Sequence, residues 1–482
     1  MFKHSFNKFF PTPDFLATLS FGLDISDDSL KFVELISTKN DIRINKYGKR
    51  KIPSGTIESG KIINKEKIEN LLLSLKKDYG IKFARVSIPE NQVYLFKLIL
   101  PKEGLVSIKE GIELSLEEHI PLPAPETIFD YELLSENEES LELEVAAISK
   151  NIIENYLSVF KNCGISVCSF ELEAQAIARS VVPRGDMDTY MIVDFGEKST
   201  CIFIISKGVV MFTSTLDIGG MVLNNMIQKN FKVNFEEADR MKKEYGLQRN
   251  TPNQEIFSVL LNSVSVLRDE LVKHFTYWNT HKDEEGNGNP QIKKIILCGG
   301  DSNLTGLVDY LSISIKIKAE MANVWINVMD TEKHIPDMSF KHSLSFAAAV
   351  GLALGKFEDN KYLILEVTSH ALDQYRFWGI NFDIGVITNI THEHLDYHKT
   401  FENYKNTKLK LIKAAKFAVI NGVMGGMREI RGIRGKVITF GLDKGDFNQK
   451  QLKLKLKTPG DYNIENALSA VAVAFTQNIS KE

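Results

Sequence analysis

Two aspartates, far apart in the chain, each follow an apolar strand and enter a tight turn toward a second strand, and this repeated pattern limits the fold most. Asp24 stands in GLDISDDSLK (residues 22–31) and Asp194 in DFGEKST (194–200). In each segment the turn amides can face a phosphate, while the carboxylate holds Mg²⁺ through water. Two such hairpins can close on one phosphate chain from opposite sides. The pattern therefore predicts two similar domains with a shared site.

A third motif completes the prediction of an ATP site. The apolar run 293–298 ends in Gly299-Gly300-Asp301-Ser302, where paired glycines let the backbone lie against a purine and a ribose. Each motif alone is also typical of an ordinary glycine turn between strands. Three motifs in this order and at domain-scale spacing favour one site for ATP with Mg²⁺.

Alternating strands and helices predict an α/β protein rather than a helical bundle or a β-sandwich. The predicted strands are two within 18–36 around a turn at 26–28, and others at 84–87, 93–98, 141–148, 190–196, 201–206, 208–213 and 293–298. The predicted helices are 66–78, a glutamate-rich stretch that ends at Pro121, a long region over 235–280, and an alanine-rich one over 343–355. No repeat of short, fixed period is visible.

Composition excludes several classes of protein. The 482 residues carry a formal charge of −3, so no summed field indicates nucleic acid or anionic membrane as the main partner. The four cysteines include one C-x4-C pair, which fits neither a zinc knuckle nor a redox motif. No apolar run is long enough to span a bilayer, and the start does not resemble a signal peptide. We expect a cytoplasmic protein.

Further segments extend the three motifs into a resemblance. They are EHIPLP (118–123), FELEAQA (170–176), DIGG (217–220), EEADRMK (236–242) and SFAAAVGLA (345–353). Together with the motifs, they resemble the type IV pilus assembly PilM family of the actin-like superfamily, which is related to the cell-division protein FtsA. The resemblance covers about residues 18–356. It implies an actin-like, ribonuclease H-like fold of two domains, 18–187 with a small insertion at about 85–160, and 188–357, after an N-terminal tail of residues 1–17.

The resemblance also assigns roles to residues. It implies a first phosphate loop with Asp24, Ser26 and Lys31, a second with Asp194, Gly196, Ser199 and Thr200, nucleoside contacts from Glu237 and Lys242, adenosine contacts from Gly299, Gly300 and Ser302, Mg²⁺ at Asp24 and Asp194, and Glu173 as the catalytic carboxylate. One departure concerns the first loop. The family usually has hydroxyls where this chain has Asp27 and Asp28, and added carboxylates beside a polyphosphate weaken binding or make it depend on Mg²⁺.

The PilM resemblance implies a scaffold rather than a dedicated enzyme, with at most weak ATPase activity. Members of the family grasp the N-terminal peptide of the membrane protein PilN and organise pilus assembly proteins at the inner face of the cell membrane. We therefore expect a PilN-like peptide to bind around residues 85–180, with membrane association through such partners and no nucleic acid. An FtsA-like division protein is an alternative, although the membrane-binding C-terminal helix of that family is not evident here.

A change of composition after residues 358–360 marks a different C-terminal segment. Four of the ten histidines lie between His370 and His398. His392, His394 and His398 are compatible with a zinc site, and equally with a polar loop at a strand end, because no cysteine lies nearby and the spacing is loose. The residues alone do not separate these alternatives.

A second resemblance applies to this C-terminal segment, residues 361–482. LEVTSHALDQ (365–374), TNITHEHLDYH (388–398), YKNTK (404–408) and GDYNIENAL (460–468) resemble the central ATPase domain of Mur ligases, above all MurE. The resemblance implies Mg²⁺ ligands Glu366, His394 and carbamylated Lys408, substrate contact by Arg376, and adenine contact by Asn466. No G-x-x-x-x-G-K-[ST] loop occurs in the chain. We therefore expect an incomplete domain without amide ligase activity, although an active MurE-like ligase of peptidoglycan synthesis is the alternative.

Overall fold

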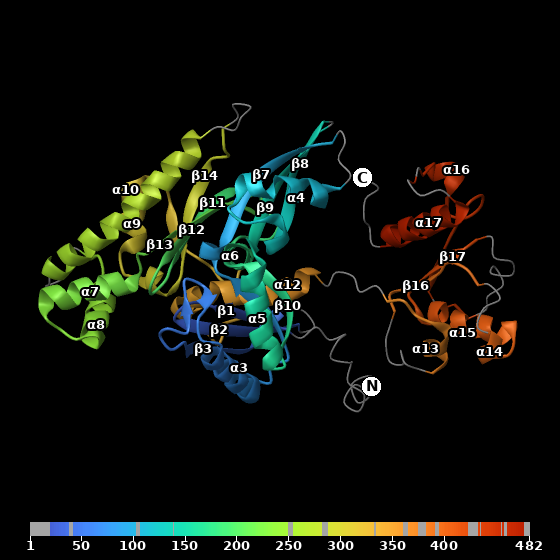
Figure 1. Cartoon of the computed structure of the whole chain (residues 1–482), viewed down its shortest axis with the longest axis horizontal. Helices are drawn as coiled ribbons and strands as arrows, with labels where there is room; N and C mark the ends of the chain where they lie inside the picture. Colours follow the sequence, from blue (N-terminus) through green and yellow to red (C-terminus); the bar gives the residue numbers. More distant parts are fainter. Residues whose placement is uncertain are drawn as a thin grey trace. The chain divides into compact units, whose positions relative to one another are not determined.

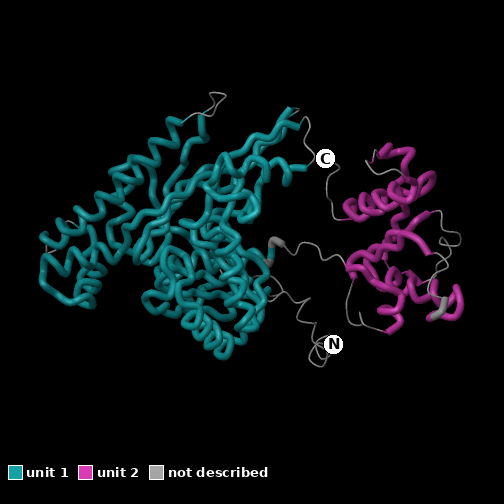
Figure 2. The backbone as a smooth tube through the Cα atoms, viewed as in Figure 1, with its two compact units in different colours: residues 1–361 teal, residues 362–482 magenta. Residues whose placement is uncertain are grey.

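The computed structural model divides the chain into two compact units, residues 1–361 and 362–482 (Figures 1 and 2). The structure describes residues 20–37, 42–102, 107–137, 139–248, 254–281, 288–331, 334–359, 365–374, 382–390, 395–422, 432–433, 435–454, 456 and 460–476. Within these ranges, no helix combines the length and the apolar character that a membrane crossing requires. Each unit has its own sheets and core and is described by itself.

The first sheet of unit 1 carries the first predicted hairpin. Its order is β10-β6-β1-β2-β3. The strands are β1 (Phe21–Ile25), β2 (Ser29–Ser37), β3 (Ile42–Lys51), β6 (Phe83–Ile88) and β10 (Ser166–Leu172). The first three strands form an antiparallel meander, and β6 and β10 add to β1 in parallel. The turn between β1 and β2 therefore lies at the same edge as the carboxyl end of β6.

The second sheet repeats this topology. Its order is β13-β12-β11-β14-β15, and its strands are β11 (Thr189–Phe195), β12 (Thr200–Ser206), β13 (Val209–Leu216), β14 (Ile292–Cys298) and β15 (Ala319–Met321). Again three strands form an antiparallel meander, and two follow in parallel. The two similar halves that the paired aspartate motifs predict are present.

Two helices rich in small residues join the halves: α6 (Glu173–Val181) and α12 (Ala347–Asp359). A shared core contains Val33 from the first sheet, Ile192 from the second and Ala349 from α12. The helices approach so closely that a Cβ on Gly351 would lie 1.6 Å from the carbonyl oxygen of Ala176. This contact fixes the position of one phosphate hairpin relative to the other.

Other helices cover the outer faces of the two sheets. In the first half these are α3 (Lys65–Tyr79) and α5 (Lys150–Asn162), and in the second α7 (Gly220–Phe231), α9 (Gln254–Thr280) and α10 (Leu307–Ile315). The predicted long helical region over 235–280 is present as two helices, α8 (Phe235–Tyr245) and α9. They are separate because α8 ends at Gly246, whose φ of 54° departs from a right-handed helix.

A small three-stranded sheet is inserted between β6 and β10. Its order is β7-β9-β8, with β7 (Val93–Pro101), β8 (Thr127–Glu136) and β9 (Ser140–Ser149). The helix α4 (Ile108–His119) packs on one face through Ile112 and Leu116. The remaining elements of unit 1 are short: β4 (Ile57–Glu58), β5 (Lys61–Ile62), α11 (Phe340–Ser343) and the 3-10 turns η1 (Glu90–Gln92), η2 (Ala124–Glu126), η3 (Gly300–Asn303) and η4 (Leu344–Phe346).

Unit 2 is a parallel sheet flanked by helices. The order is β16-β17-β18-β19, and every pair is parallel. Its elements are α13 (Ser369–Asp373), β16 (Ile384–Ile387), α14 (Leu395–His398), α15 (Phe401–Ala414), β17 (Phe417–Asn421), β18 (Lys436–Gly441), β19 (Phe447–Asn448), α16 (Gln449–Leu452) and α17 (Asp461–Thr476). Leu468 of α17 packs on Val419 and Phe440. A parallel sheet of this kind agrees with the α/β architecture predicted for this segment.

Candidate functional site

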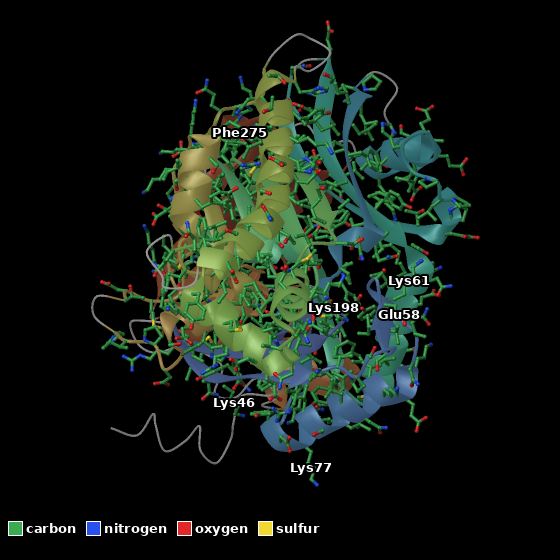
Figure 3. The ribbon with its side chains drawn as sticks, turned by 90° about the vertical axis from the view of Figure 1, so that its left-hand side faces the viewer. Lys46, Glu58, Lys61, Lys77, Lys198 and Phe275 are labelled. Atoms are coloured by element: carbon green, nitrogen blue, oxygen red, sulfur yellow. The ribbon has the colours of Figure 1, made fainter. Side chains whose placement is uncertain are left out.

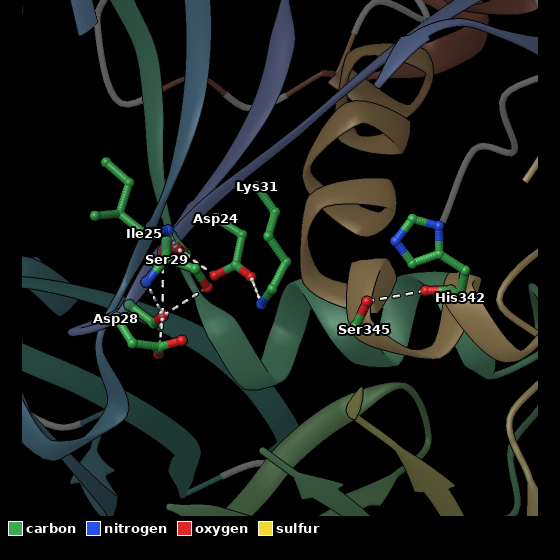
Figure 4. A network of polar contacts seen from close by, with 9 residues as sticks. Asp24, Ile25, Asp28, Ser29, Lys31, His342 and Ser345 are labelled. Atoms are coloured by element: carbon green, nitrogen blue, oxygen red, sulfur yellow. Dashed lines mark hydrogen bonds and ion pairs between the residues drawn. The ribbon is translucent and has the colours of Figure 1, made fainter. Parts of the chain in front are cut away.

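The first hairpin presents an ion pair at the edge of the first sheet (Figure 4). Asp24 on β1 and Lys31 on β2 are paired in register, and the Lys31 ammonium lies 2.9 Å from the Asp24 carboxylate. Ser87 at the end of β6 donates a hydrogen bond to the other oxygen of Asp24, at 3.3 Å. Burial alone lowers the pKa of Lys31, but Asp24 outweighs burial and the pKa is raised well above its ordinary value. Lys31 is therefore a fixed cation.

The two aspartates that depart from the family pattern have their own partners. Asp27 accepts hydrogen bonds from the backbone amides of Ser59 and Gly60, at 2.8 and 2.9 Å. Asp28 accepts one from the hydroxyl of Ser26 at 2.9 Å. Hydrogen-bond donors stabilise these carboxylates and reduce the field that they direct toward a neighbouring anion. Asp27 thus fixes the β4-β5 turn against the first phosphate loop.

The second hairpin mirrors the first. Asp194 on β11 pairs in register with Cys201 on β12, and the turn closes with a 3.0 Å hydrogen bond from the Gly196 amide to the Ser199 carbonyl. Thr200, which the resemblance places in this phosphate loop, is fully buried and donates a 2.5 Å hydrogen bond to the Ile218 carbonyl. Thr200 therefore anchors the following loop, whereas Asp194 is positioned to face a ligand.

A cavity of about 320 Å³ lies between the two hairpins, and we call it the phosphate cleft. Eight of the residues assigned from the sequence line it: Ser26, Lys31, Glu173, Asp194, Gly196, Ser199, Gly299 and Gly300. Figure 3 shows Lys198 near Glu58 and Lys61, and Ser59 and Gly60 between these two line the same cleft as Lys198. Both halves of unit 1 therefore contribute to one cleft.

Carboxylates dominate the electrostatics of the phosphate cleft. Burial raises the pKa of Glu173 well above its usual value, with Asp24 and Asp194 adding repulsion. Burial also raises the pKa of Asp194 to about 6, although Lys31 opposes the shift. Such a cluster favours a cation or protons in the cleft, and a polyanion needs a divalent metal to bind beside it. Within the described ranges, no three acidic, histidine or cysteine side chains form a metal site by themselves.

Glu90 is a cleft residue that sequence reasoning missed. It lies in η1, lines the cleft and accepts a 2.6 Å hydrogen bond from the Ala174 amide, one residue beyond Glu173. Burial raises its pKa to about 7, and the hydrogen bond from Ala174 opposes that shift. Its position directly after β6 could have revealed it. Strand β6 runs parallel to β1, and the carboxyl ends of neighbouring parallel strands meet at one edge of a sheet.

The adenosine motif separates the phosphate cleft from a second cavity. Gly299 has a φ of 89°, and a Cβ there would lie 2.4 Å from the Asp194 carboxylate. The second cavity, of about 430 Å³, shares Gly300, Asp301 and Ser345 with the cleft and adds Lys242. The contiguous pair has room for a polyphosphate on one side and a nucleoside on the other. Asp301 and Ser345 join the two cavities and were not assigned from the sequence.

The nucleoside residues assigned from the sequence divide into two groups. Lys242 lines the second cavity, and its ammonium lies 2.6 Å from the carboxylate of Asp301. Glu237 forms an ion pair with Arg240 one turn along α8, at 2.6 Å, and lines neither cavity. Ser302 is fully buried and donates to the Cys298 carbonyl. The structure brings Lys242 to the site but does not bring Glu237 or Ser302 to it.

A third cavity lies over the inserted sheet, and we call it the insertion groove. It measures about 580 Å³, with β7, β9 and β8 on one side and β10 and α6 on the other. Its lining is mostly apolar and includes Leu95, Ile128, Ala146 and Phe170. This groove falls inside residues 85–180, where we expect a peptide to dock, and Val209 and Val210 of the second half also line it.

The residues assigned in unit 2 are only partly described. Glu366 and Asn466 are exposed. Lys408 lies over the ring of Tyr404, with its ammonium 4.9 Å from the ring centre, and donates to the Asn389 carbonyl at 3.4 Å. His394 and Arg376 fall outside the described residues, as does His392, so the predicted metal set in unit 2 stays a prediction.

Comparison with known proteins decides the family. The model of the type IV pilus assembly protein PilM matches residues 22–357. The chain belongs to this family. A chain of the solved PilM-PilN type IV pilus biogenesis complex is 20% identical, with a TM-score of 0.59, and the match covers 70% of the present chain and 98% of that chain. The predicted actin-like α/β fold of the PilM family is thereby confirmed.

The C-terminal part has different relatives. The Mur ligase middle-domain model matches residues 316–474, so it overlaps the PilM match over 316–357. The UDP-N-acetylmuramoyl-L-alanyl-D-glutamate--2,6-diaminopimelate ligase of Clostridium perfringens is 35% identical over 144 residues, which are 25% of this chain and 30% of the ligase. Ligase 1 of Clostridium acetobutylicum is 38% identical over 141 residues, or 25% of this chain and 29% of that ligase. The chain thus spans less than a third of these relatives.

Proposed function

We propose that the chain is an ATP-binding scaffold for type IV pilus assembly at the inner face of the cell membrane, which docks the N-terminal peptide of a PilN-like membrane protein. The observation that carries the nucleotide half is the phosphate cleft, in which Lys31 and Asp194 from two similar hairpins face one cavity. In this proposal ATP occupies the phosphate cleft and the adjoining cavity. Mg²⁺ would supply the positive charge that the phosphates need beside these carboxylates. Asp194, which lines the cleft, would hold its water shell, while Asp24 holds Lys31 in place.

The residues of the cleft have different roles in the proposed binding of ATP. Lys31 supplies a positive charge, and the turn amides of both hairpins face the phosphates. Gly299 and Gly300 admit the nucleoside, while Lys242 and Asp301 form a fixed wall beside it. Glu173 at the first turn of α6 is the carboxylate available to orient a water molecule against the terminal phosphate. A scaffold needs only slow hydrolysis, so we assign Glu173 to a weak ATPase step.

Nucleotide binding is tested by Asp194→Ala in the full chain. We expect isothermal titration to show ATP·Mg²⁺ binding to the native chain and none to the variant, because the variant lacks the carboxylate that holds the metal's water shell. Asp188→Ala is the matched control, since Asp188 precedes the same strand, is half exposed, and pairs with Lys293 away from the cleft. Equal ATP affinity in Asp194→Ala and the native chain would refute the site.

For the partner, the insertion groove is the structural support, and the solved PilM-PilN complex is the comparison that suggests its occupant. We expect the cytoplasmic tail of a PilN-like protein to bind the full chain with roughly micromolar affinity in the presence of ATP. Ile128→Arg should abolish this binding, because Ile128 lines the groove. Leu133→Arg should not, since Leu133 is similarly exposed on the same strand but does not line the groove. Failure of the tail to bind in a pull-down would contradict the proposal.

We infer that the Mur-like unit is not an amide ligase. The reaction needs the phosphate chain of ATP to be held by successive amides and a lysine of a glycine-rich loop. No G-x-x-x-x-G-K-[ST] occurs in the chain, and GLALGKF (351–357) lacks the hydroxyl and forms part of α12 in unit 1. Glu366 and Lys408 therefore have no phosphate to bridge to Mg²⁺ in this unit.

A further inference from the structure

The insertion groove has a floor whose chemistry changes along its length. Strand register places residues of β7, β9 and β8 side by side on the face opposite α4. One row of three is apolar, Val93, Ile148 and Ile128, and the second row along from it is charged, Lys97, Glu144 and Glu132. The groove therefore combines apolar contacts at one end with a carboxylate on the central strand at the other.

Glu144 is an unusual floor residue because it is buried and one of its carboxylate oxygens has no hydrogen-bond donor. Its side chain is only 4% exposed and lines the groove, and its Oε2 atom has no hydrogen-bond donor. A carboxylate removed from water without a donor destabilises the fold, so its presence needs a reason other than stability. A ligand that brings a donor into the groove would supply the missing interaction.

The cations of the groove and of its floor are engaged by other carboxylates. Lys97, the neighbour of Glu144 in register, points its ammonium to Glu142 at 3.5 Å. On the opposite wall, Arg85 and Arg179 both bind the carboxylate of Glu171, at 3.1 and 2.5 Å. The groove lining contains four carboxylates, of Asp130, Glu132, Glu144 and Glu171, and only these two guanidinium groups. The balance of charge favours a cationic occupant.

We propose that Glu144 is a specificity residue of the insertion groove, and that it pairs with a lysine or arginine side chain of the docked peptide. The inference rests on the proposed docking of a PilN-like tail and adds the chemistry by which that tail is selected. The apolar row takes apolar side chains of an extended peptide, while Glu144 requires a positive charge at one position. Pairing replaces the missing donor, so a tail without that charge leaves a buried carboxylate unsatisfied.

A double-mutant cycle on the full chain tests this inference. The probe is the N-acetylated cytoplasmic tail of the PilN-like protein, made as a series in which each lysine or arginine is changed in turn to glutamine. One change in the series should weaken binding to the native chain by at least about tenfold. Glu144→Gln should weaken binding of the native tail by a similar factor. In this variant, the critical peptide change should cause no further loss of affinity.

Glu142→Gln is the matched control for the cycle. It stands on the same strand and the same face, but its carboxylate already pairs with Lys97. With this variant, the critical peptide change should still weaken binding as in the native chain. If every cationic position of the tail is additive with Glu144→Gln, the inference is overturned while the docking proposal stands. If the native tail does not bind at all, both are overturned.

The pH dependence of tail binding is a second measurement, and a purely structural role of Glu144 would not affect it. Burial raises the pKa of Glu144 to about 8, with Lys97 opposing and Glu142 adding to the shift. Glu132 lies beside Glu144 in register, and Arg85, Glu171 and Arg179 also line the groove. Since the paired form is the carboxylate, affinity should fall about tenfold per pH unit below pH 8. Glu144→Gln should remove this dependence, and an unchanged slope in the variant would count against the pairing.

Discussion

Gly351→Ala is expected to destabilise unit 1 by about 4 kcal/mol or more, which is among the largest effects of a single substitution. The Cβ of alanine would lie 1.6 Å from the carbonyl oxygen of Ala176 and 2.4 Å from its carbonyl carbon. These are backbone atoms of α6 and cannot rotate away, so the two helices must separate and the shared core must open. Denaturant unfolding followed by circular dichroism measures the change.

Gly355→Ala is the control for this effect because it lies one turn further along the same helix. Its Cβ would meet only the ends of long side chains, with the Arg85 guanidinium nearest at 3.2 Å. These ends can give way, and alanine is favoured over glycine in a helix interior by roughly 1 kcal/mol. We expect near-native stability. Comparable destabilisation in Gly355→Ala and Gly351→Ala would show that the close approach of α6 and α12 is not what matters.

The elements that sequence patterns predict best are those with apolar runs bounded by turn residues. Both phosphate hairpins, α3 and the strand before Gly299 follow such patterns, and the structure confirms them. Strand β8 was not predicted, because Thr127–Glu136 lies at a sheet edge and most of its side chains are exposed. An exposed edge strand carries little hydrophobic periodicity, so only its pairing with β9 reveals it.

The site was predicted unevenly for a similar reason. Motifs indicated Lys31 and Asp194, which line the cleft, because the turns between paired strands leave a local signature, whereas Asp24 is buried as the partner of Lys31. Burial and partners decide the rest, and these depend on distant residues. Ser302 and Thr200 carry hydroxyls beside the motifs, yet each hydroxyl donates its hydrogen bond to a backbone carbonyl. Asp27 and Asp28 seemed adverse from the sequence, whereas contacts with Ser59, Gly60 and Ser26 account for them.

The predicted functions divide in the same way. Local motifs are sufficient to indicate a polyphosphate cleft, since the chemistry is concentrated in two turns. The insertion groove has no motif, and it exists only because β7, β8 and β9 pair so that alternate side chains face β10. Glu144 in particular lies in an alternating strand, ELEV (142–145), where every second residue would be assigned to solvent. The pairing of three strands puts it instead on a buried floor.

Gly299→Ala is expected to abolish nucleotide binding and also to lower the stability of unit 1. Gly299 has a φ of 89° and a ψ of 159°, a conformation that is essentially restricted to glycine and costs an alanine about 1–3 kcal/mol. In addition, the new Cβ would lie 2.4 Å from the Asp194 carboxylate and 2.4 Å from the Phe195 carbonyl oxygen. Asp194 can rotate, but only by leaving the position from which it would hold the metal's water shell. Loss of ATP·Mg²⁺ binding should therefore exceed about 100-fold, a change of 2.7 kcal/mol or more.

Gly208→Ala is the control for this experiment, because it places an alanine at a positive φ without bringing its Cβ against other atoms. Gly208 has a nearly equal φ of 81°, on the turn between β12 and β13, and a Cβ there meets nothing within 4 Å. It therefore carries the conformational cost without displacing Asp194. We expect Gly299→Ala to melt at a lower temperature than Gly208→Ala, because its Cβ also meets the Phe195 backbone. At a temperature where both variants are folded, ATP affinity should be native in Gly208→Ala and absent in Gly299→Ala. If both variants bind ATP as the native chain does, then Gly299 and Asp194 do not share a nucleotide site, and the cleft must serve another ligand.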